Sequence, residues 1–154
     1  MSTLLVTGGG GFVLSYLVRH WAGLNPTNRV IVLDATPLDA SVATFFEPAA
    51  RQIRFIQGVV SDAATWDRLQ AQTGDISHIV HGAAVTSIDR LWRADGLRGA
   101  VPAMATNLMG VSHALGFAGA LSSLQRFVFV SSGSVYDAHG HQALGQPPAR
   151  GRQR

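Results

Sequence analysis

Short apolar segments rich in β-branched residues alternate along this chain with longer segments in which apolar residues recur every three or four positions. The short segments predict five strands, at residues 3–7, 29–34, 53–57, 76–81 and 126–131. Strands separated by helical segments are typical of βαβ units, which place the strands parallel in one sheet. The pattern therefore predicts an α/β fold with a partial doubly wound parallel sheet of about five strands and flanking helices.

The connections between the predicted strands carry helical periodicity. Apolar residues over 13–24 recur at helical spacing, and a shorter segment around Trp66 repeats it. The connection over 86–121 is longer and is interrupted by two glycines and a proline, at Gly96, Gly99 and Pro102. We therefore expect a loop or short turn there, followed by one helix over about 101–121.

After Tyr136 the periodicity stops, and the chain becomes rich in glycine, proline, glutamine and arginine. This composition predicts a disordered tail over 138–154 and a single folded domain over 1–137. The domain is expected to be incomplete, because a full doubly wound nucleotide-binding fold needs about six strands. The abrupt change near residue 137 favours the hypothesis that a frameshift or a premature stop produced the tail.

With 47% hydrophobic and 14% charged residues, the chain has the balance of a globular domain. No apolar run approaches the ~18 residues of a membrane span, and no basic leader precedes the first apolar segment. We therefore expect a cytoplasmic protein that is not inserted in a membrane. The absence of cysteine excludes disulfides and thiolate metal sites, and no other metal site is expected.

All 12 basic residues are arginine, and three of them lie in the last five positions. The first 149 residues carry nine arginines and nine acids, so the body of the chain is formally neutral. This distribution argues against a nucleic-acid partner. Without lysine, the chain has no Schiff-base lysine, no lysine general base and no Tyr-x-x-x-Lys pair.

The first candidate site is the glycine run Gly8–Gly11, which joins the first predicted strand to the first predicted helix. Glycine lets the backbone approach a pyrophosphate, and the positive end of the helix dipole attracts it. Asp34 ends the second predicted strand 23 residues after Gly11, near the ~20-residue offset of a ribose-binding carboxylate. Together they favour a dinucleotide, and the charge of Asp34 favours NAD over NADP. Alternatively, the glycines are needed only for a tight turn between strand and helix, and Asp34 caps the next helix.

Four segments in order along residues 3–137 carry a family resemblance: Thr7-Gly8-Gly9-Gly10-Gly11-Phe12-Val13, His81-Gly82-Ala83-Ala84, Asn107-Leu108-Met109-Gly110 and Val130-Ser131-Ser132-Gly133-Ser134-Val135-Tyr136. They resemble the motifs of the extended short-chain dehydrogenase/reductases, the NAD-dependent sugar-nucleotide epimerases and dehydratases. The resemblance implies that residues 1–137 are an incomplete Rossmann-like, NAD-binding domain.

The resemblance also implies roles for individual residues. The cofactor-binding residues would contact the pyrophosphate (Gly8, Gly11, Phe12, Val13), the ribose (Asp34), the adenine (Val60) and the path toward the nicotinamide (Gly82, Ala83, Ala84). Asn107 would belong to the helix that supports the active site, and Ser132 would be the catalytic hydroxyl that binds the substrate hydroxyl or carbonyl. Alternatively, the small residues only allow helix and strand to pack closely. Asn107 and the serines could likewise only form hydrogen bonds with nearby backbone.

Three departures from the family pattern bear on function. Leu14 stands where a third glycine is expected, so we expect the first helix to be pushed outward. Val59 replaces an acid that would accept the adenine amino group, whereas Asp62 is expected to cap the next helix. Both changes predict weak NAD binding. The Tyr-x-x-x-Lys pair that exchanges a proton with the substrate is missing.

Three functions remain open at this point. The favoured one is an NAD-dependent epimerase/dehydratase-like protein that is truncated before its catalytic Tyr-x-x-x-Lys, so whether the chain is an enzyme is left open. The others are a non-catalytic NAD-binding module and a subunit completed by a partner chain. A nucleotide-sugar or a similar small molecule is the expected ligand of a completed site, and an oligomer is not excluded.

Overall fold

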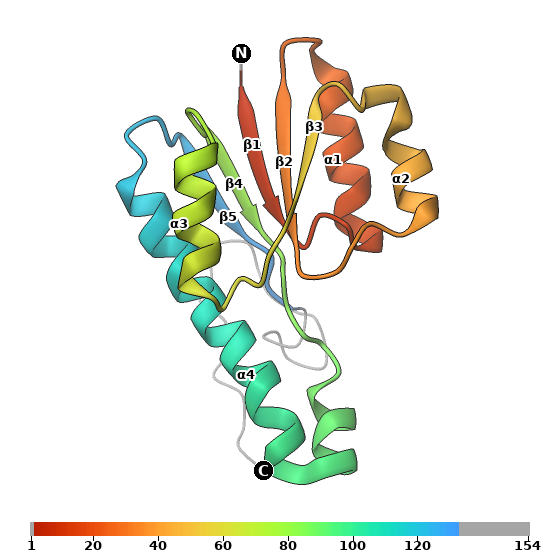
Figure 1. Ribbon diagram of the computed structural model, residues 1–154, viewed down its shortest axis with the longest axis vertical. Coiled ribbons are helices and arrows are strands. Elements are labelled where there is room, and N and C mark those ends of the chain that lie inside the picture. The colour runs from red at the N-terminus through yellow and green to blue at the C-terminus, as the bar shows by residue number, and fades with distance from the viewer. Residues whose placement is uncertain (1, 133–154) are drawn as a thin grey trace, which may run out of the picture.

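A parallel five-stranded sheet of order β3-β2-β1-β4-β5 forms the centre of the computed structural model, which describes residues 2–132 (Figure 1). The strands are β1 (Thr3–Thr7), β2 (Arg29–Asp34), β3 (Ile53–Gln57), β4 (His78–His81) and β5 (Arg126–Phe129). The sheet confirms the predicted α/β class, and β4 and β5 are each two residues shorter than expected. Because all the strands are parallel, their carboxyl ends meet at one edge of the sheet.

Both faces of the sheet are covered, which explains why the strands are apolar at nearly every position rather than at alternate ones. One face packs Leu4, Val6, Val30 and Val32 against α1 and α2; the other packs Leu5, Ile31, Leu33 and Ile79 against α3 and α4. Figure 1 shows α1 and α2 on one side of the sheet and α3 and α4 on the other.

Three helices precede β4: α1 (Phe12–Leu24), α2 (Ala40–Phe46), which continues into a short 3-10 turn, and α3 (Ala63–Gln72). The sequence pattern did not predict α2, because seven residues are too few to show a helical repeat. Its start is fixed by Asp39, whose side chain accepts a hydrogen bond from the Ser41 N–H. Asp62 caps α3 through the Ala64 N–H, as expected.

The long connection before β5 differs from its prediction. Helix α4 runs over Ile88–Ala120 and has a kink at Asp95 and Gly96, so the expected loop up to about residue 101 is wrong. Gly96 adopts φ of +50°, which turns the chain, and a Cβ on Gly99 would lie 2.5 Å from the Leu91 carbonyl oxygen. Gly96 therefore interrupts the helix, and Gly99 lets the helical segments on the two sides of the kink approach closely.

Apolar side chains are exposed on β5 and directly after it. Val128, Phe129 and Val130 all leave much of their side chains exposed. Tyr136 and the predicted tail over 138–154 lie outside the described residues. Within residues 2–132, no helix is long and apolar enough to cross a membrane.

Candidate functional site

The turn between β1 and α1 requires glycine at its first position. Gly8 adopts φ of +74°, and a Cβ there would come within 3.0 Å of the Ala83 backbone. Its N–H donates to the Leu33 carbonyl at 2.8 Å, which ties the turn to the end of β2. The tight turn therefore brings the glycine run against the segments that follow β2 and β4.

Helix α1 begins without a side-chain cap. Gly11 is the N-cap, no acid lies in the first turn, and the side chains of Phe12 and Val13 are 80% and 73% exposed. The N–H groups of Phe12 and Val13 bond no other described residue, since the first N–H groups of a helix have no partner within it. This end of α1 offers free donors and partial positive charge to an anion.

Asp34 lies at the end of β2, beside the glycine run. One carboxylate oxygen accepts the Gly10 N–H at 3.1 Å, and the other accepts the N–H and the hydroxyl of Thr36, each at 3.2 Å. A carboxylate has about four acceptor positions, so these three bonds leave room for one more donor, such as a ribose hydroxyl. Asp34 does not cap α2, since Asp39 has that role.

A buried network at the end of β4 was not predicted from the sequence. The Thr7 hydroxyl oxygen accepts the N–H groups of Gly82 and Ala83, both at 3.2 Å, and lies 2.8 Å from Nδ1 of His81. The hydroxyl and Nδ1 share one hydrogen bond, and Nε2 of His81 is buried without a hydrogen-bond partner among residues 2–132. Burial lowers the pKa of His81, which favours the neutral form of the ring.

Asn107 holds the segment that follows β4. Its side-chain oxygen accepts the Val85 N–H at 2.7 Å, and its amide nitrogen donates to the Val85 carbonyl at 3.0 Å. Paired bonds of this kind replace a strand partner and fix the backbone position. The Asn107 side chain thus bonds the backbone of the segment after β4, which is the alternative that the sequence analysis gave for it.

The glycine run, Asp34 and the end of β4 surround one cavity of about 340 Å³ at the carboxyl edge of the sheet. Of the residues proposed from the sequence, seven line it: Gly8, Gly11, Asp34, Val60, Gly82, Ala83 and Ala84. The other lining residues are Gly10, Ala35, Thr36, Gly58, Val59, Val85 and Thr106. Phe12, Val13, Asn107 and Ser132 do not line it; Ser132 is exposed, beyond β5.

Leu14 is accommodated without moving α1 from the sheet. A Cβ on Gly82 would lie 2.4 Å from Leu14 Cδ1, so the leucine side chain occupies the space above that glycine. Val18 and Ala22, further along α1, are almost completely buried against the sheet. The expected outward shift is therefore avoided, and Leu14 does not line the cavity.

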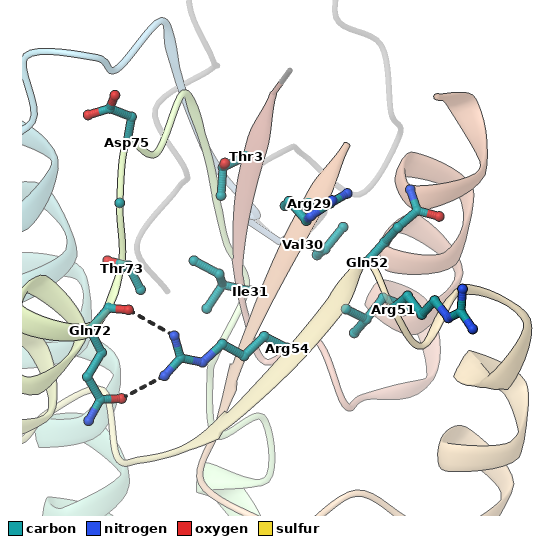
Figure 2. Close-up of a pocket in the computed structure, with 12 residues that line it drawn as sticks. Thr3, Arg29, Val30, Ile31, Arg51, Gln52, Arg54, Gln72, Thr73 and Asp75 are labelled. Atoms are coloured by element: carbon teal, nitrogen blue, oxygen red, sulfur yellow. Dashed lines mark hydrogen bonds between the residues drawn. The ribbon is translucent and has the colours of Figure 1, made fainter. Parts of the chain in front are cut away.

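A second cavity, also of about 340 Å³, lies at the opposite edge, and Figure 2 shows its lining. Arg29, Arg51 and Arg54 border it. The Arg54 guanidinium points to Gln72 and donates to its backbone and side-chain oxygens at 2.8 and 3.1 Å, whereas Arg51 points the other way (Figure 2). These charges do not converge on one ligand, and no cluster suited to a metal ion occurs within residues 2–132.

Comparison with known proteins places this geometry in context. The model of the NAD dependent epimerase/dehydratase family matches residues 4–151. A dTDP-glucose 4,6-dehydratase from Actinoplanes sp. is 30% identical, over 95% of this chain and 45% of that protein. This chain therefore spans less than half the length of that relative.

Two solved structures show the same fold. A dTDP-glucose 4,6-dehydratase from Bacillus anthracis, in complex with NAD, superposes with a TM-score of 0.74 at 21% identity, covering 98% of this chain and 45% of that one. A double mutant of a Streptomyces venezuelae dTDP-glucose 4,6-dehydratase, with NAD and DAU bound, gives 0.68 at 33% identity, covering 86% and 40%. They bear out the Rossmann-like architecture predicted from the sequence.

Proposed function

The chain belongs to the NAD dependent epimerase/dehydratase family, and we propose that it binds NAD across the carboxyl edge of its sheet. One observation carries the proposal: a single cavity joins the glycine run, Asp34 and the residues that follow β3 and β4. A glycine run that opens a helix, followed by an acid on the next strand, is the arrangement that binds a dinucleotide in doubly wound folds.

The residues present suit the parts of this cofactor. A Cβ on Gly8, Gly10 or Gly11 would lie 3.0–3.2 Å from other protein atoms, so the fold itself requires glycine here. With no side chains at these positions, a pyrophosphate could approach the backbone directly. The uncapped α1 supplies donors and partial positive charge to the phosphates. Asp34 has one acceptor position left for the ribose.

The charge of Asp34 favours NAD over NADP. A 2′-phosphate would lie beside this carboxylate, and among residues 2–132 no cationic side chain lines the cavity to offset the repulsion. Thr36, the nearest polar neighbour, already donates to Asp34. The charge of Asp34 would therefore repel the extra phosphate of NADP.

We further propose that the natural substrate class is a sugar nucleotide, with Ser132 hydrogen-bonding its hydroxyl or carbonyl. Bound NAD would supply hydride exchange with such a substrate. A proton must be exchanged as well, and this chain contains no lysine for a Tyr-x-x-x-Lys pair. Turnover by this chain alone is therefore not expected, and NAD binding is the activity to measure.

Titration with NADH tests the proposal, with energy transfer from tryptophan to the reduced nicotinamide as the readout. Trp66 serves as a donor because its indole N–H bonds the Val60 carbonyl at 2.8 Å, next to the cavity. Saturable binding that NAD competes away is the expected result. A flat titration with folded protein would refute the proposal.

A variant with a negative charge at the start of α1 distinguishes a loss of NADH affinity from a loss of stability. Val13→Glu puts an anion in the uncapped first turn, which stabilises the helix but repels a pyrophosphate. We expect NADH to bind at least about threefold more weakly, with an unchanged or higher melting temperature. Val13→Gln, which has the same shape and no charge, is the matched control and should retain wild-type affinity.

A second candidate, a subunit completed by a partner chain, is favoured by the edge of the sheet at β5, where no strand within residues 2–132 pairs with the outer side of β5. Val128, Phe129 and Val130 are exposed there, and a strand edge with apolar side chains is a template for further pairing. Co-purification of a chain that carries Tyr-x-x-x-Lys, together with recovered turnover, would support this candidate over an NAD-binding module that acts alone.

A further inference from the structure

Strand β5 ends the sheet within residues 2–132, and one side of its backbone has no strand beside it. The Val130 N–H donates to the His81 carbonyl at 2.9 Å, so the backbone groups of Val130 face β4. The backbone groups of alternate residues in a strand point to opposite sides. Phe127 and Phe129 therefore turn their N–H and carbonyl groups away from β4, toward the open edge.

The strand itself contains little that would prevent further pairing. After Arg126, the segment up to Val130 is apolar and has no proline, the residue that commonly blocks an edge strand. We propose that a second copy of this chain covers the edge: β5 pairs antiparallel with β5 of the second copy, about a two-fold axis at Val128, and the two sheets become one. The proposal does not depend on NAD binding, since no residue of β5 lines the cavity at the carboxyl edge.

The directions of the backbone groups select this register. With Val128 opposite Val128 of the second copy, Phe127 of each copy lies opposite Phe129 of the other. Two opposed residues of an antiparallel pair exchange two hydrogen bonds when both turn their backbone groups toward the partner strand. All the outward groups of Phe127 and Phe129 thereby find partners, whereas an axis at either phenylalanine would pair only one of the two. The edge is thus its own complement.

The side chains also suit an identical partner. Phe127 packs against the core on the side of α3 and α4, and Phe129 lies on the same face because side chains alternate along a strand. The register therefore forms two cross-strand aromatic pairs, which stabilise a sheet. Arg126 lies opposite Val130 of the second copy, so the two arginines stand at opposite ends of the paired strands, about 13 Å apart. No like charges face each other.

Helix α4 extends this surface beyond the strands. Phe127 packs against the same core cluster as Phe117 of α4, and a two-fold axis perpendicular to the sheet places the α4 helices of both copies on one face. From Gly99 to Ala120 the helix has no charged Asp, Glu, Lys or Arg side chain, and Leu108 and Leu115 are 73% and 53% exposed. Two copies of α4 can therefore approach without repulsion, and they add apolar contact that two short strands alone would not supply.

A single introduced cysteine tests the axis, because the chain has none of its own. In Val128→Cys the two thiols lie across the axis, at a Cα separation of about 4.5 Å, within the range of a disulfide. Val130→Cys is the matched control: Val130 is 46% exposed, against 42% for Val128, but lies about 13 Å from its copy. Light scattering should give the mass of a dimer for the wild type. After mild oxidation, Val128→Cys should run as a covalent dimer on a denaturing gel and Val130→Cys should run as a monomer.

Charge exchange at the same position tests the pairing without oxidation. Val128→Glu and Val128→Lys each place like charges directly opposite one another, so each should weaken the dimer by about fivefold or more. A mixture of the two variants should dimerise again, because glutamate then faces lysine. Val128→Gln, which has no charge, is the control and should remain a dimer. Melting temperatures check that each variant is folded.

Four results would overturn the proposal. One is a wild-type chain that is folded and monomeric, and another is a different chain bound to it in equal amount, which would assign the edge to a foreign partner. Equal crosslinking of Val128→Cys and Val130→Cys, or none at Val128→Cys in a wild-type-like dimer, would place the contact elsewhere on the surface. Val128→Glu and Val128→Lys that dimerise separately as well as they do together would show that the two side chains do not meet.

Discussion

Leu14 and Gly82 occupy complementary space between α1 and the end of β4: a Cβ on Gly82 would come within 2.4 Å of Leu14 Cδ1. A leucine at this point of α1 needs a residue without a side chain opposite it. The pair explains how the chain tolerates Leu14 while Val18 and Ala22 remain buried against the sheet. The space is provided by β4 and not by a displaced helix.

This relationship predicts coupled effects on stability. Gly82→Ala should lower the free energy of unfolding by about 1 kcal/mol, because the added methyl group must displace the flexible end of Leu14. In a Leu14→Ala background the same substitution should cost less, since the space is already empty. Urea unfolding of the two single variants and the double variant measures the coupling. Strictly additive effects would show that the contact does not constrain the packing.

Removal of the Thr7 hydroxyl should destabilise the fold. Thr7→Val keeps the shape but leaves the Ala83 N–H and Nδ1 of His81 without their partner, whereas the Gly82 N–H keeps its bond to the Thr7 backbone carbonyl at 3.1 Å. The expected loss is about 2 kcal/mol or more, because buried polar groups without partners are costly. Thr36→Val, at an exposed position, is the control for a threonine-to-valine change and should cost much less. Equal melting temperatures for the two variants would speak against the network.

The buried His81 predicts a pH-dependent stability. Burial lowers its pKa in the folded state, so the unfolded chain binds the proton more readily than the native one. The free energy of unfolding should therefore fall as the pH drops below the ordinary histidine pKa, about 6.5, with a slope of at most about 1.4 kcal/mol per pH unit. The loss should continue until the native His81 is itself protonated.

Urea unfolding at a series of pH values between about 7.5 and 5 measures this slope. His81→Gln removes the titrating ring, so its stability should change less over the same range even if the variant is weaker at every pH. Asp39 does not interfere, since hydrogen bonds from Ser41 lower the pKa of its carboxyl and its stabilising effect is lost only at more acidic pH. Parallel pH profiles for the wild type and the variant would rule out His81 as the source.

Asp34 should set the choice between the two dinucleotides. Asp34→Asn keeps an oxygen for the Gly10 N–H but removes the charge that repels a 2′-phosphate. The ratio of the NADPH to the NADH dissociation constant should fall by about tenfold, which corresponds to about 1.4 kcal/mol. Fluorescence titrations with both nucleotides measure it. An unchanged ratio would place the adenosine ribose away from Asp34.

The frameshift hypothesis makes a prediction at the level of the gene. If the composition change near residue 137 has that origin, another reading frame beyond the Tyr136 codon should encode a Tyr-x-x-x-Lys and a continuing α/β pattern. Sequencing of the coding DNA, with translation of all three forward frames, checks this. The absence of such a continuation would favour an NAD-binding module.

The sheet could be predicted because its strands are buried on both faces and are therefore marked by continuous apolar runs such as Val30–Leu33. Helix α2 was missed because a capped helix of only seven residues leaves no periodic signal. The start of α4 was placed too late because the short helical segment before Gly96 was taken as loop. The helix is interrupted at Gly96, but Gly99 lies within the segment that follows, where its missing side chain permits a close approach to Leu91.

The candidate site was predictable in part for a similar reason. Gly8, Gly11 and Asp34 stand at fixed offsets from strand ends, and parallel strands bring such ends together. The network of Thr7 with His81 could not be predicted, because the two residues are 74 positions apart and nothing local pairs them. Its one sequence signal is a pair of polar residues at the ends of apolar strands. Asn107 was singled out as part of a supporting helix, but its partner, the backbone of Val85, could not be named from the sequence.

Mapping of NAD onto the chain by amide chemical shifts tests the central claim most directly. NAD is added to the isotopically labelled protein, and each N–H resonance reports its own environment. The account predicts saturable shifts at Phe12, Val13, Val60 and Gly82, around the cavity at the carboxyl edge, and none at Gln52 or Thr73 at the opposite edge. Shifts confined to the Gln52 and Thr73 edge, or no shifts at all in the folded protein, would contradict it.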